Sequence, residues 1–256
     1  MLDSYHIKIN VKGKADKVKI VCLSDIHFGH EDCRVDMLDK YIDYIKQKKA
    51  YWFINGDLIE MAIHSHMGFT MWSQKMNPEK QIAEIIRKFE PIKDRCLFIA
   101  EGNHEARSSK ATSIRPSKII AEALQTLHIG IGGYVVFEIG KQKYVCGVQH
   151  GSSGGAANPK SEFQKMQKVY GDAEILVLSH NHQLYDLSDV TFELDEDGKP
   201  RRRQILFVRT GTFLDYAEYS QEKMYAPGIV GAAILTLGVN EHTKRADTSA
   251  TLSREE

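Results

Sequence analysis

Apolar runs rich in β-branched residues recur along the chain and alternate with segments of helical spacing. The runs occupy residues 18–24, 51–56, 96–102, 144–150 and 174–180. Their length and composition predict buried strands. Between the first three runs, apolar stripes of helical period lie at Leu38, Tyr41, Ile42 and Ile45, and at Ile82, Ile85, Ile86 and Phe89. This alternation of strand and helix predicts βαβ units, with a largely parallel sheet and helices packed against it.

The second half of the chain predicts more strands than helices. A third helix is predicted at 117–127, with an apolar stripe at Ile120, Ala123, Leu124 and Leu127. A fourth helix is predicted at 161–169. Segments 184–194 and 203–210 flank Asp197-Gly198, a strong turn signal, so we expect them to pair as a hairpin.

A further apolar run at 228–238 is predicted to be a strand of the same second sheet as this hairpin. From Val239 the chain becomes polar. We therefore predict one α/β domain over residues 1–238, built from two mixed β-sheets flanked by helices. Residues 239–256 are predicted to form a flexible C-terminal tail.

Composition narrows the classes of protein that fit. Hydrophobic residues make up 42% and charged residues 27%, which is ordinary for a globular protein. The 34 basic and 34 acidic residues cancel, which weighs against a protein that grips long nucleic acids through phosphates. Neither a membrane span nor a signal peptide is visible, so we expect a cytoplasmic protein without membrane contact. The cysteines lack CxxC spacing and are expected to be reduced core residues.

Each of the five predicted strands ends in, or just before, a group that can bind a metal. The motifs are SDIH, GD, GNHE, QHG and SHNH, in chain order. Strand ends line the ligand crevice of open α/β sheets, so we expect these groups to meet although they span residues 25 to 182. Carboxylate, imidazole and carboxamide groups without a thiolate favour Mn, Fe, Zn or Ni over a zinc finger or a soft copper site.

Each motif alone is a weak signal, whereas all five in this order resemble the calcineurin-like metallophosphoesterase family, whose pattern runs DxH, GD, GNH[DE], H, GHxH. The resemblance implies that family's sandwich fold and a centre of two divalent metal ions, with Mn as the first expectation. It implies that Asp25, His27 and His182 hold one metal, that Asn103, His150 and His180 hold the other, and that Asp57 bridges them. The chain departs from the pattern at Ser179, where the family usually has glycine, and this affects the shape of the loop.

The same resemblance implies that His104 stabilises or protonates the leaving oxygen, as the corresponding histidine does in the family. We expect Glu105 to orient His104. Arg107 is the nearest guanidinium in sequence and suits bidentate phosphate contact, with a surface ion pair as the alternative. His64 and His66 are candidates for substrate contact or, alternatively, solvated loop residues.

The predicted reaction is hydrolysis of a phosphate ester by a metal-bridging hydroxide, because two cations lower the pKa of a shared water and neutralise phosphoryl oxygens. We expect phosphodiester or nucleotide substrates. One alternative is a DNA or RNA nuclease with the same site. The other, from a different class, is a metal-binding scaffold without catalysis. The choice of substrate is expected to depend on the insert at 58–81 and the aromatic segment at 211–227.

Overall fold

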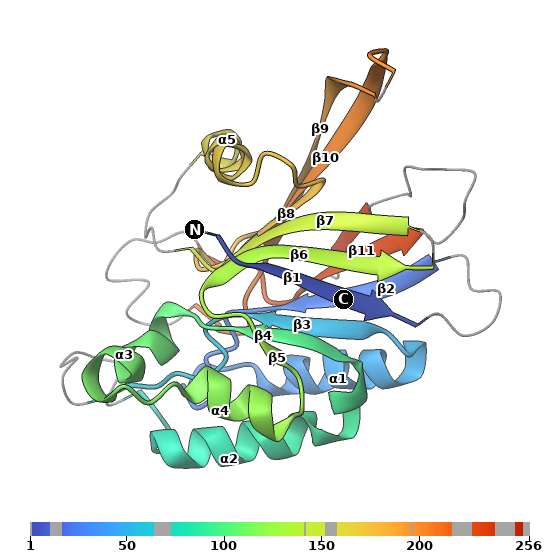
Figure 1. The fold of residues 1–256 in the computed structure, drawn as a ribbon. Coiled ribbons are helices and arrows are strands. Elements are labelled where there is room, and N and C mark those ends of the chain that lie inside the picture. The colour runs from blue at the N-terminus through green and yellow to red at the C-terminus, as the bar shows by residue number, and fades with distance from the viewer. Residues whose placement is uncertain are drawn as a thin grey trace.

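Two six-stranded mixed β-sheets stack face to face, and helices cover the outer face of each (Figure 1). This computed structural model describes residues 2–10, 17–63, 73–140, 142–151, 158–195, 197–216, 227–238 and 249–252. The first sheet has the order β12-β11-β2-β3-β4-β5, with bounds β2 Lys17–Leu23, β3 Tyr51–Asn55, β4 Cys96–Ala100, β5 Leu127–His128, β11 Ala233–Gly238 and β12 Ser249–Leu252. The second has the order β1-β6-β7-β8-β10-β9, with bounds β1 Ser4–Ile9, β6 Gly132–Ile139, β7 Gln142–Gln149, β8 Ile175–Leu178, β9 Leu184–Leu194 and β10 Pro200–Thr210. The predicted α/β sandwich is confirmed.

The first sheet separates two parts of the hydrophobic core. β2, β3, β4 and β5 are parallel, and α1 and α2 form the crossovers between the first three. Side chains alternate across β2: Val21 and Leu23 pack against the helices, whereas Ile20 and Cys22 pack against the second sheet. Both faces of these strands are therefore buried, which explains why their sequences read as continuous apolar runs.

The helices occupy α1 Val35–Lys48, α2 Pro78–Phe89, α3 Asn103–Thr112, α4 Pro116–Ala123 and α5 Pro159–Val169, and a 3₁₀ turn, η2, spans Glu90–Arg95. The apolar stripes predicted for α1 and α2 face the first sheet. An asparagine followed by proline begins α2: Asn77 Oδ1 accepts a hydrogen bond from the Lys80 amide at 2.9 Å. Asn158 starts α5 in the same way, and α5 covers the outer face of the second sheet.

β9 and β10 form the predicted hairpin, which extends beyond the body of the protein as an arm (Figure 1). Gly198 adopts a φ of 76° in its turn. Val190, Phe192 and Leu194 alternate along β9 and are 54%, 70% and 69% exposed. The outer half of this arm therefore leaves a row of large apolar side chains in solvent.

Several features of the fold differ from the prediction, among them the helix α3, which was not predicted. The helix predicted at 117–127 ends at Ala123, because Gln125 takes a left-handed φ of 56° and Leu127 begins β5. Ala123 and Leu127 are consequently exposed, and the buried stripe runs through Ile120, Ala121 and Leu124. β11 pairs antiparallel with β2 and so belongs to the first sheet, not the second. β1 and β6, a parallel pair, were not predicted as strands.

β12 lies inside the stretch that was predicted to be a flexible tail, and it pairs with β11. The domain boundary at residue 238 stays a prediction. The four cysteines are free, and Cys22 and Cys146 are buried. No helix in the described part of the chain has the length and apolar character needed to cross a membrane.

Candidate metal centre

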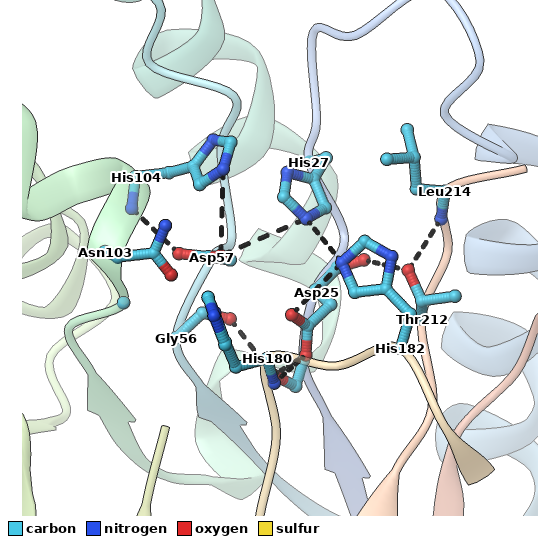
Figure 2. Close-up of polar contacts among 12 residues, drawn as sticks. Asp25, His27, Gly56, Asp57, Asn103, His104, His180, His182, Thr212 and Leu214 are labelled. Carbon is cyan, nitrogen blue, oxygen red and sulfur yellow. Dashed lines mark hydrogen bonds and ion pairs between the residues drawn. The ribbon is translucent and has the colours of Figure 1, made fainter. Parts of the chain in front are cut away.

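The groups predicted to bind metal meet where five strands end. Asp25 and His27 follow β2, Asp57 follows β3, and Asn103 with His104 begins α3 just after β4. His150 follows β7, and His180 and His182 follow β8. β2, β3 and β4 belong to the first sheet, whereas β7 and β8 belong to the second. The tips therefore converge across the sandwich and not along one sheet, as Figure 2 shows for the residues that it labels.

Asp25, His27 and His182 bring their ligand atoms to within 4.8 Å of one another. His27 Nε2 lies 3.2 Å from His182 Nε2, and His182 Nε2 lies 3.5 Å from Asp25 Oδ1. Two nitrogen atoms bound about 2.1 Å from one cation are about 3.0–3.5 Å apart. Asp25 Oδ1 is buried and has no hydrogen-bond partner in the part of the chain that the structure describes. These three side chains thus fit a shared cation.

A second group forms around His150. Its Nε2 lies 3.0 Å from Asn103 Oδ1 and 3.2 Å from Asp57 Oδ2. His180 offers a ligand atom within 4.8 Å of those of Asp57 and His150. Its Nδ1 is buried, and no described residue forms a hydrogen bond with it. Nitrogen and oxygen donors without sulfur suit Mn, Fe, Zn or Ni, as predicted. This second group also fits a cation.

Asp57 lies between the two groups (Figure 2). Its Oδ2 is 3.2 Å from His150 Nε2 on one side and 4.0 Å from His27 Nε2 on the other. Its Oδ1 accepts a hydrogen bond from the His104 amide at 2.9 Å, which fixes the carboxylate plane. This is the location that a carboxylate shared by two cations requires.

The backbone at the site is strained. Five of the predicted ligands have positive φ angles, which are uncommon outside glycine: Asp25 at 49°, His27 at 50°, Asp57 at 49°, His180 at 80° and His182 at 59°. Strain of this kind persists only where the surrounding structure fixes it, and it concentrates at functional sites. The strand ends are therefore shaped to aim these side chains, at a cost in local stability.

The two glycines in the GD and GNHE motifs allow close approach of the chains. A Cβ on Gly102 would lie 2.1 Å from Asp57 Oδ1, and one on Gly56 would lie 2.5 Å from His150 Nδ1. Gly56 also has a φ of 87°. Both positions therefore require glycine because the ligands pack directly on the backbone.

Acceptors outside the centre fix the tautomers of three histidines. His27 Nδ1 donates to Glu60 Oε2 at 3.1 Å, His150 Nδ1 donates to the Asn55 carbonyl at 2.7 Å, and His104 Nδ1 donates to the Glu60 carbonyl at 2.8 Å. Since these partners only accept, Nε2 is the ring atom of His27 and His150 that faces the centre. Outer hydrogen bonds of this kind orient imidazole ligands and raise their basicity.

Charge in the buried centre is strongly coupled. Burial alone would lower the pKa of His150, but the neighbouring Asp57 raises it to about 10. Burial would raise the pKa of Asp57, yet His150 and His104 hold it well below its ordinary value. Burial lowers the pKa of His182 to about 4, and burial with His150 lowers that of His180. The Asp57 carboxylate thus stabilises a positive charge beside it. In the metal-free protein a proton on His150 supplies that charge, as a cation would in the metal-bound protein.

Glu60 is the functional residue that sequence reasoning missed. Its side chain is 1% exposed, and its Oε2 contacts His27 Nδ1 at 3.1 Å and His104 Nδ1 at 3.4 Å. Burial would raise its pKa, but hydrogen bonds from His104 and His27 lower it. The sequence feature that could have pointed to Glu60 is its position three residues after Asp57, in GDLIE.

Glu105 does not take the orienting role that was predicted for it. Its carboxylate accepts hydrogen bonds from the amides of Asp57, Leu58, Ile59 and Gly102, at 2.7 to 3.1 Å. Burial and Asp57 raise its pKa. Glu105 therefore holds the loop that carries Asp57, and the orienting contact of His104 belongs to Glu60. A glutamate at the third position of a helix is a known capping signal.

Arg107, predicted as a phosphate contact or a surface ion-pair partner, lies beside His104. Its Nη2 contacts His104 Nε2 at 3.0 Å and its Nη1 donates to the Glu60 carbonyl at 3.2 Å. His64 and His66 lie outside the described residues, as does much of the insert at 58–81 and of the aromatic segment at 211–227.

Two serines tie the strand ends together. Ser24 Oγ donates to Asp25 Oδ2 at 2.6 Å. Ser179, which stands where the motif usually has glycine, accepts hydrogen bonds through Oγ from Asn55 Nδ2 at 2.6 Å and Thr210 Oγ1 at 2.9 Å. The serine hydroxyl therefore bridges β3 of one sheet and β10 of the other.

The sequence model that describes calcineurin-like phosphoesterases matches residues 18–207, about three quarters of the chain. The chain belongs to the calcineurin-like phosphoesterase family. Metal-dependent hydrolysis of phosphate esters is the chemistry of this calcineurin-like phosphoesterase family, and the two donor groups that share Asp57 match its dinuclear centre. No curated protein matches the sequence.

Several solved structures resemble this calcineurin-like phosphoesterase. Vacuolar protein sorting 29 from Cryptosporidium parvum is 14% identical with a TM-score of 0.49, over 94% of this chain and 100% of that chain. YfcE, a phosphoesterase from E. coli, is 13% identical with a TM-score of 0.45, over 92% of this chain and 97% of that chain. NAD nucleotidase from Haemophilus influenzae is 12% identical with a TM-score of 0.45, over 92% of this chain and 49% of that chain.

Proposed function

We propose that this chain is a two-metal hydrolase that cleaves phosphodiesters or nucleotides. The observation that carries the proposal is that Asp57 lies between two groups of buried and half-buried nitrogen and oxygen donors, with its Oδ2 4.0 Å from His27 Nε2 and 3.2 Å from His150 Nε2. Asp25, His27 and His182 would hold one cation, and Asn103, His150 and His180 the other. Bound cations would make hydroxide available near neutral pH and neutralise charge on the phosphoryl group.

His104 is proposed to act on the leaving oxygen. Burial lowers its pKa, but Asp57 and Glu60 outweigh burial and raise it to about 9. In the metal-free protein the ring therefore favours its protonated form at neutral pH, and a proton on this ring is what a departing alkoxide would take. The Nδ1 contact with the Glu60 carbonyl leaves Nε2 as the atom that transfers this proton.

Arg107 is proposed to bind a phosphoryl oxygen. Its guanidinium is held against Glu60 and the His104 ring, with a side chain that is 16% exposed. Binding of an anionic oxygen by Arg107 would draw Nη2 away from His104 Nε2 and leave that atom free to carry its proton. Arg107 thereby couples substrate binding to the protonation of His104.

Apart from the two proposed cations, which would neutralise the phosphoryl group of either ester, the charge beside His104 suits a diester better than a monoester. A diester carries one negative charge, whereas a monoester carries close to two at neutral pH. Within the described residues, Arg107 is the only cationic side chain with a hydrogen bond to the His104 ring, and the Glu60 carboxylate lies 3.6 Å from it. The Arg107 guanidinium, partly neutralised by Glu60, therefore matches the single negative charge of a diester.

The test is a paired assay of chromogenic substrates. The protein is stripped of metal, reloaded with Mn²⁺, and assayed on bis(p-nitrophenyl) phosphate and on p-nitrophenyl phosphate. We expect Mn-dependent turnover that favours the diester. Two bound Mn²⁺ ions without turnover of either substrate would overturn the proposal and support the scaffold alternative.

The His104→Ala variant tests the assignment of roles. We expect turnover to fall about 10²- to 10⁴-fold, the range for loss of a general acid, while two Mn²⁺ ions stay bound. His6→Ala is the matched control, because His6 has a side chain that is 64% exposed and lies on β1. Loss of metal in His104→Ala would instead make His104 a ligand.

The nuclease alternative predicts a different salt dependence. Contacts with successive phosphates release counterions, so activity on long DNA or RNA would fall steeply between 50 and 200 mM salt, about 10³-fold or more for six or more contacts. A small diester would show little change. A cytoplasmic location and manganese as the native metal belong to the same proposal, and metal analysis of the protein purified from its native cells tests the second.

A further inference from the structure

A buried ion pair joins α5 to β10 behind the strand end that carries His180. The side chains of Arg209 and Glu162 are 3% and 5% exposed. Arg209 Nε donates to Glu162 Oε2 at 3.0 Å, and its Nη2 donates to Glu162 Oε1, so the contact is bidentate. The Tyr185 hydroxyl donates to the same Oε2 at 3.0 Å. The two charges thus neutralise each other out of contact with solvent.

The remaining guanidinium nitrogen reaches the metal centre through the backbone. Arg209 Nη1 donates to the carbonyl of Ser179, the residue that precedes His180. The Ser179 amide donates to the His150 carbonyl at 3.1 Å, and its hydroxyl is held by Asn55 and Thr210. The carbonyl, amide and hydroxyl of Ser179 therefore all form hydrogen bonds. Among the partners in these bonds, Arg209 is the one that carries a charge.

Stability alone does not account for this pair. Removing two charges from water is costly, and apolar side chains of similar size often replace a buried ion pair without loss of stability. A guanidinium, however, presents its N–H groups in one rigid plane and can bind a carboxylate and a carbonyl at once. His180 needs such support, because its φ of 80° is strained and its Nδ1 has no partner within the described residues.

We propose that the Arg209–Glu162 pair is a positioning element of the metal centre, which fixes the Ser179 carbonyl and thereby aims the His180 imidazole at its cation. The inference rests on the proposed function, in which His180 holds one of the two cations. Groups that orient a metal ligand from outside usually contribute 10- to 100-fold to metal affinity. Loss of the pair should therefore weaken one metal site selectively.

The experiment replaces both charges together, with Glu162→Met and Arg209→Met in one variant, so that no unpaired charge stays buried. Mn²⁺ binding is measured by calorimetry and by metal analysis, and unfolding of the metal-free protein by circular dichroism. We expect an unfolding temperature close to that of the wild type, and one Mn²⁺ bound about 10- to 100-fold more weakly while the other keeps its affinity.

The matched control is the double variant Glu193→Met with Arg201→Met. This pair has the same residue types and lies on the hairpin that carries Arg209, with Arg201 Nε 2.8 Å from Glu193 Oε1, but Arg201 is 54% and Glu193 30% exposed. We expect wild-type Mn²⁺ binding from it. Arg209→Lys is the second test variant: it keeps the charge but loses the planar fork, so one site should again weaken.

The outcomes separate the two proposals. A folded double variant, or Arg209→Lys variant, that binds two Mn²⁺ ions with wild-type affinity would overturn the positioning role and leave the proposed function intact. If the double variant does not fold, Arg209→Lys decides. Wild-type protein that binds no Mn²⁺ would overturn the proposed function and this inference with it.

Discussion

Replacement of Glu60 by glutamine removes one buried charge, and with it the ion pair in which Glu60 Oε1 lies 3.6 Å from Arg107 Nη1. Glu60 Oε2 accepts the His27 Nδ1 hydrogen bond at 3.1 Å, whereas Oε1 has no hydrogen-bond partner among the residues that the structure describes. A glutamine can therefore keep a carbonyl oxygen at the first position and place its amide at the second. The tautomer of His27 survives, and the negative charge that strengthens His27 as a ligand is lost.

The expected size of the effect follows from this geometry. Outer carboxylates that orient a ligating histidine contribute 10- to 100-fold in metal affinity, or about 1.4–2.8 kcal/mol. Glu60→Gln keeps the hydrogen bond, so we expect a loss near the lower end of that range. Glu60→Ala loses both bond and charge and should reach the upper end. Because Glu60 also raises the pKa of His104, Glu60→Gln should lower the pH above which turnover declines.

The measurements are Mn²⁺ titration by calorimetry and the pH profile of diester hydrolysis. Glu84→Gln on α2 is the matched control, because Glu84 pairs with Arg87 on the surface and contacts no residue of the centre. If Glu60→Gln and Glu60→Ala both bound Mn²⁺ like the wild type and kept its pH profile, Glu60 would not orient the two histidines and the reasoning would be refuted.

Four further predictions test the centre and the core of the protein. Gly102→Ala would place a Cβ 2.1 Å from Asp57 Oδ1, so we expect loss of metal binding by metal analysis in a protein whose circular dichroism still shows the fold. Mn²⁺ must displace the proton that Asp57 holds on His150, whose pKa is about 10. The affinity for Mn²⁺ should therefore rise from pH 7 to pH 9, by up to about tenfold per pH unit for each proton released. Calorimetry in two buffers should detect that release of protons. The same raised pKa stabilises the metal-free fold below the ordinary histidine pKa of about 6.5, and this contribution should be lost as pH rises toward 10, which urea unfolding at several pH values can measure. Phe89→Ala removes a fully buried ring stacked on Trp52 and should lower the free energy of unfolding by about 3–5 kcal/mol in urea denaturation.

Local patterns located most elements of the fold but not their partners. The sequence predicted β2, β3 and β4 because both faces of these strands are buried, which gives continuous apolar runs. It predicted α1 and α2 because the face that each helix packs against the sheet is an apolar stripe of helical period. β6 was missed because Gly132 and Gly133 interrupt its start, and β1 because its core contact consists of only Ile7 and Ile9. β11 was assigned to the wrong sheet, since a buried apolar strand carries no mark of the strand that it will pair with.

The eight side chains of the candidate centre were identified from the sequence because each stands at a fixed place after a strand. Contacts made across the fold could not be identified in this way. Glu105 was expected to orient His104 because the two are adjacent, but neighbouring residues on a helix point in different directions, and Glu105 turns back to the amides around Asp57. Glu60 reaches His104 from another strand end instead.

The sequence by itself determined which chemical groups are present, in which order, and that each follows a strand; this was enough to predict the family and its dinuclear chemistry. The tertiary structure decided that these groups are divided between two sheets and that Asp57 lies between two donor sets. It also decided that Glu60 contacts His27, and that Arg209 donates to the carbonyl of Ser179, the residue before His180. The physical reason is that motifs and periodicity reflect the constraints within one segment. Packing between the sheets depends on which distant segments approach each other, and no single segment encodes that.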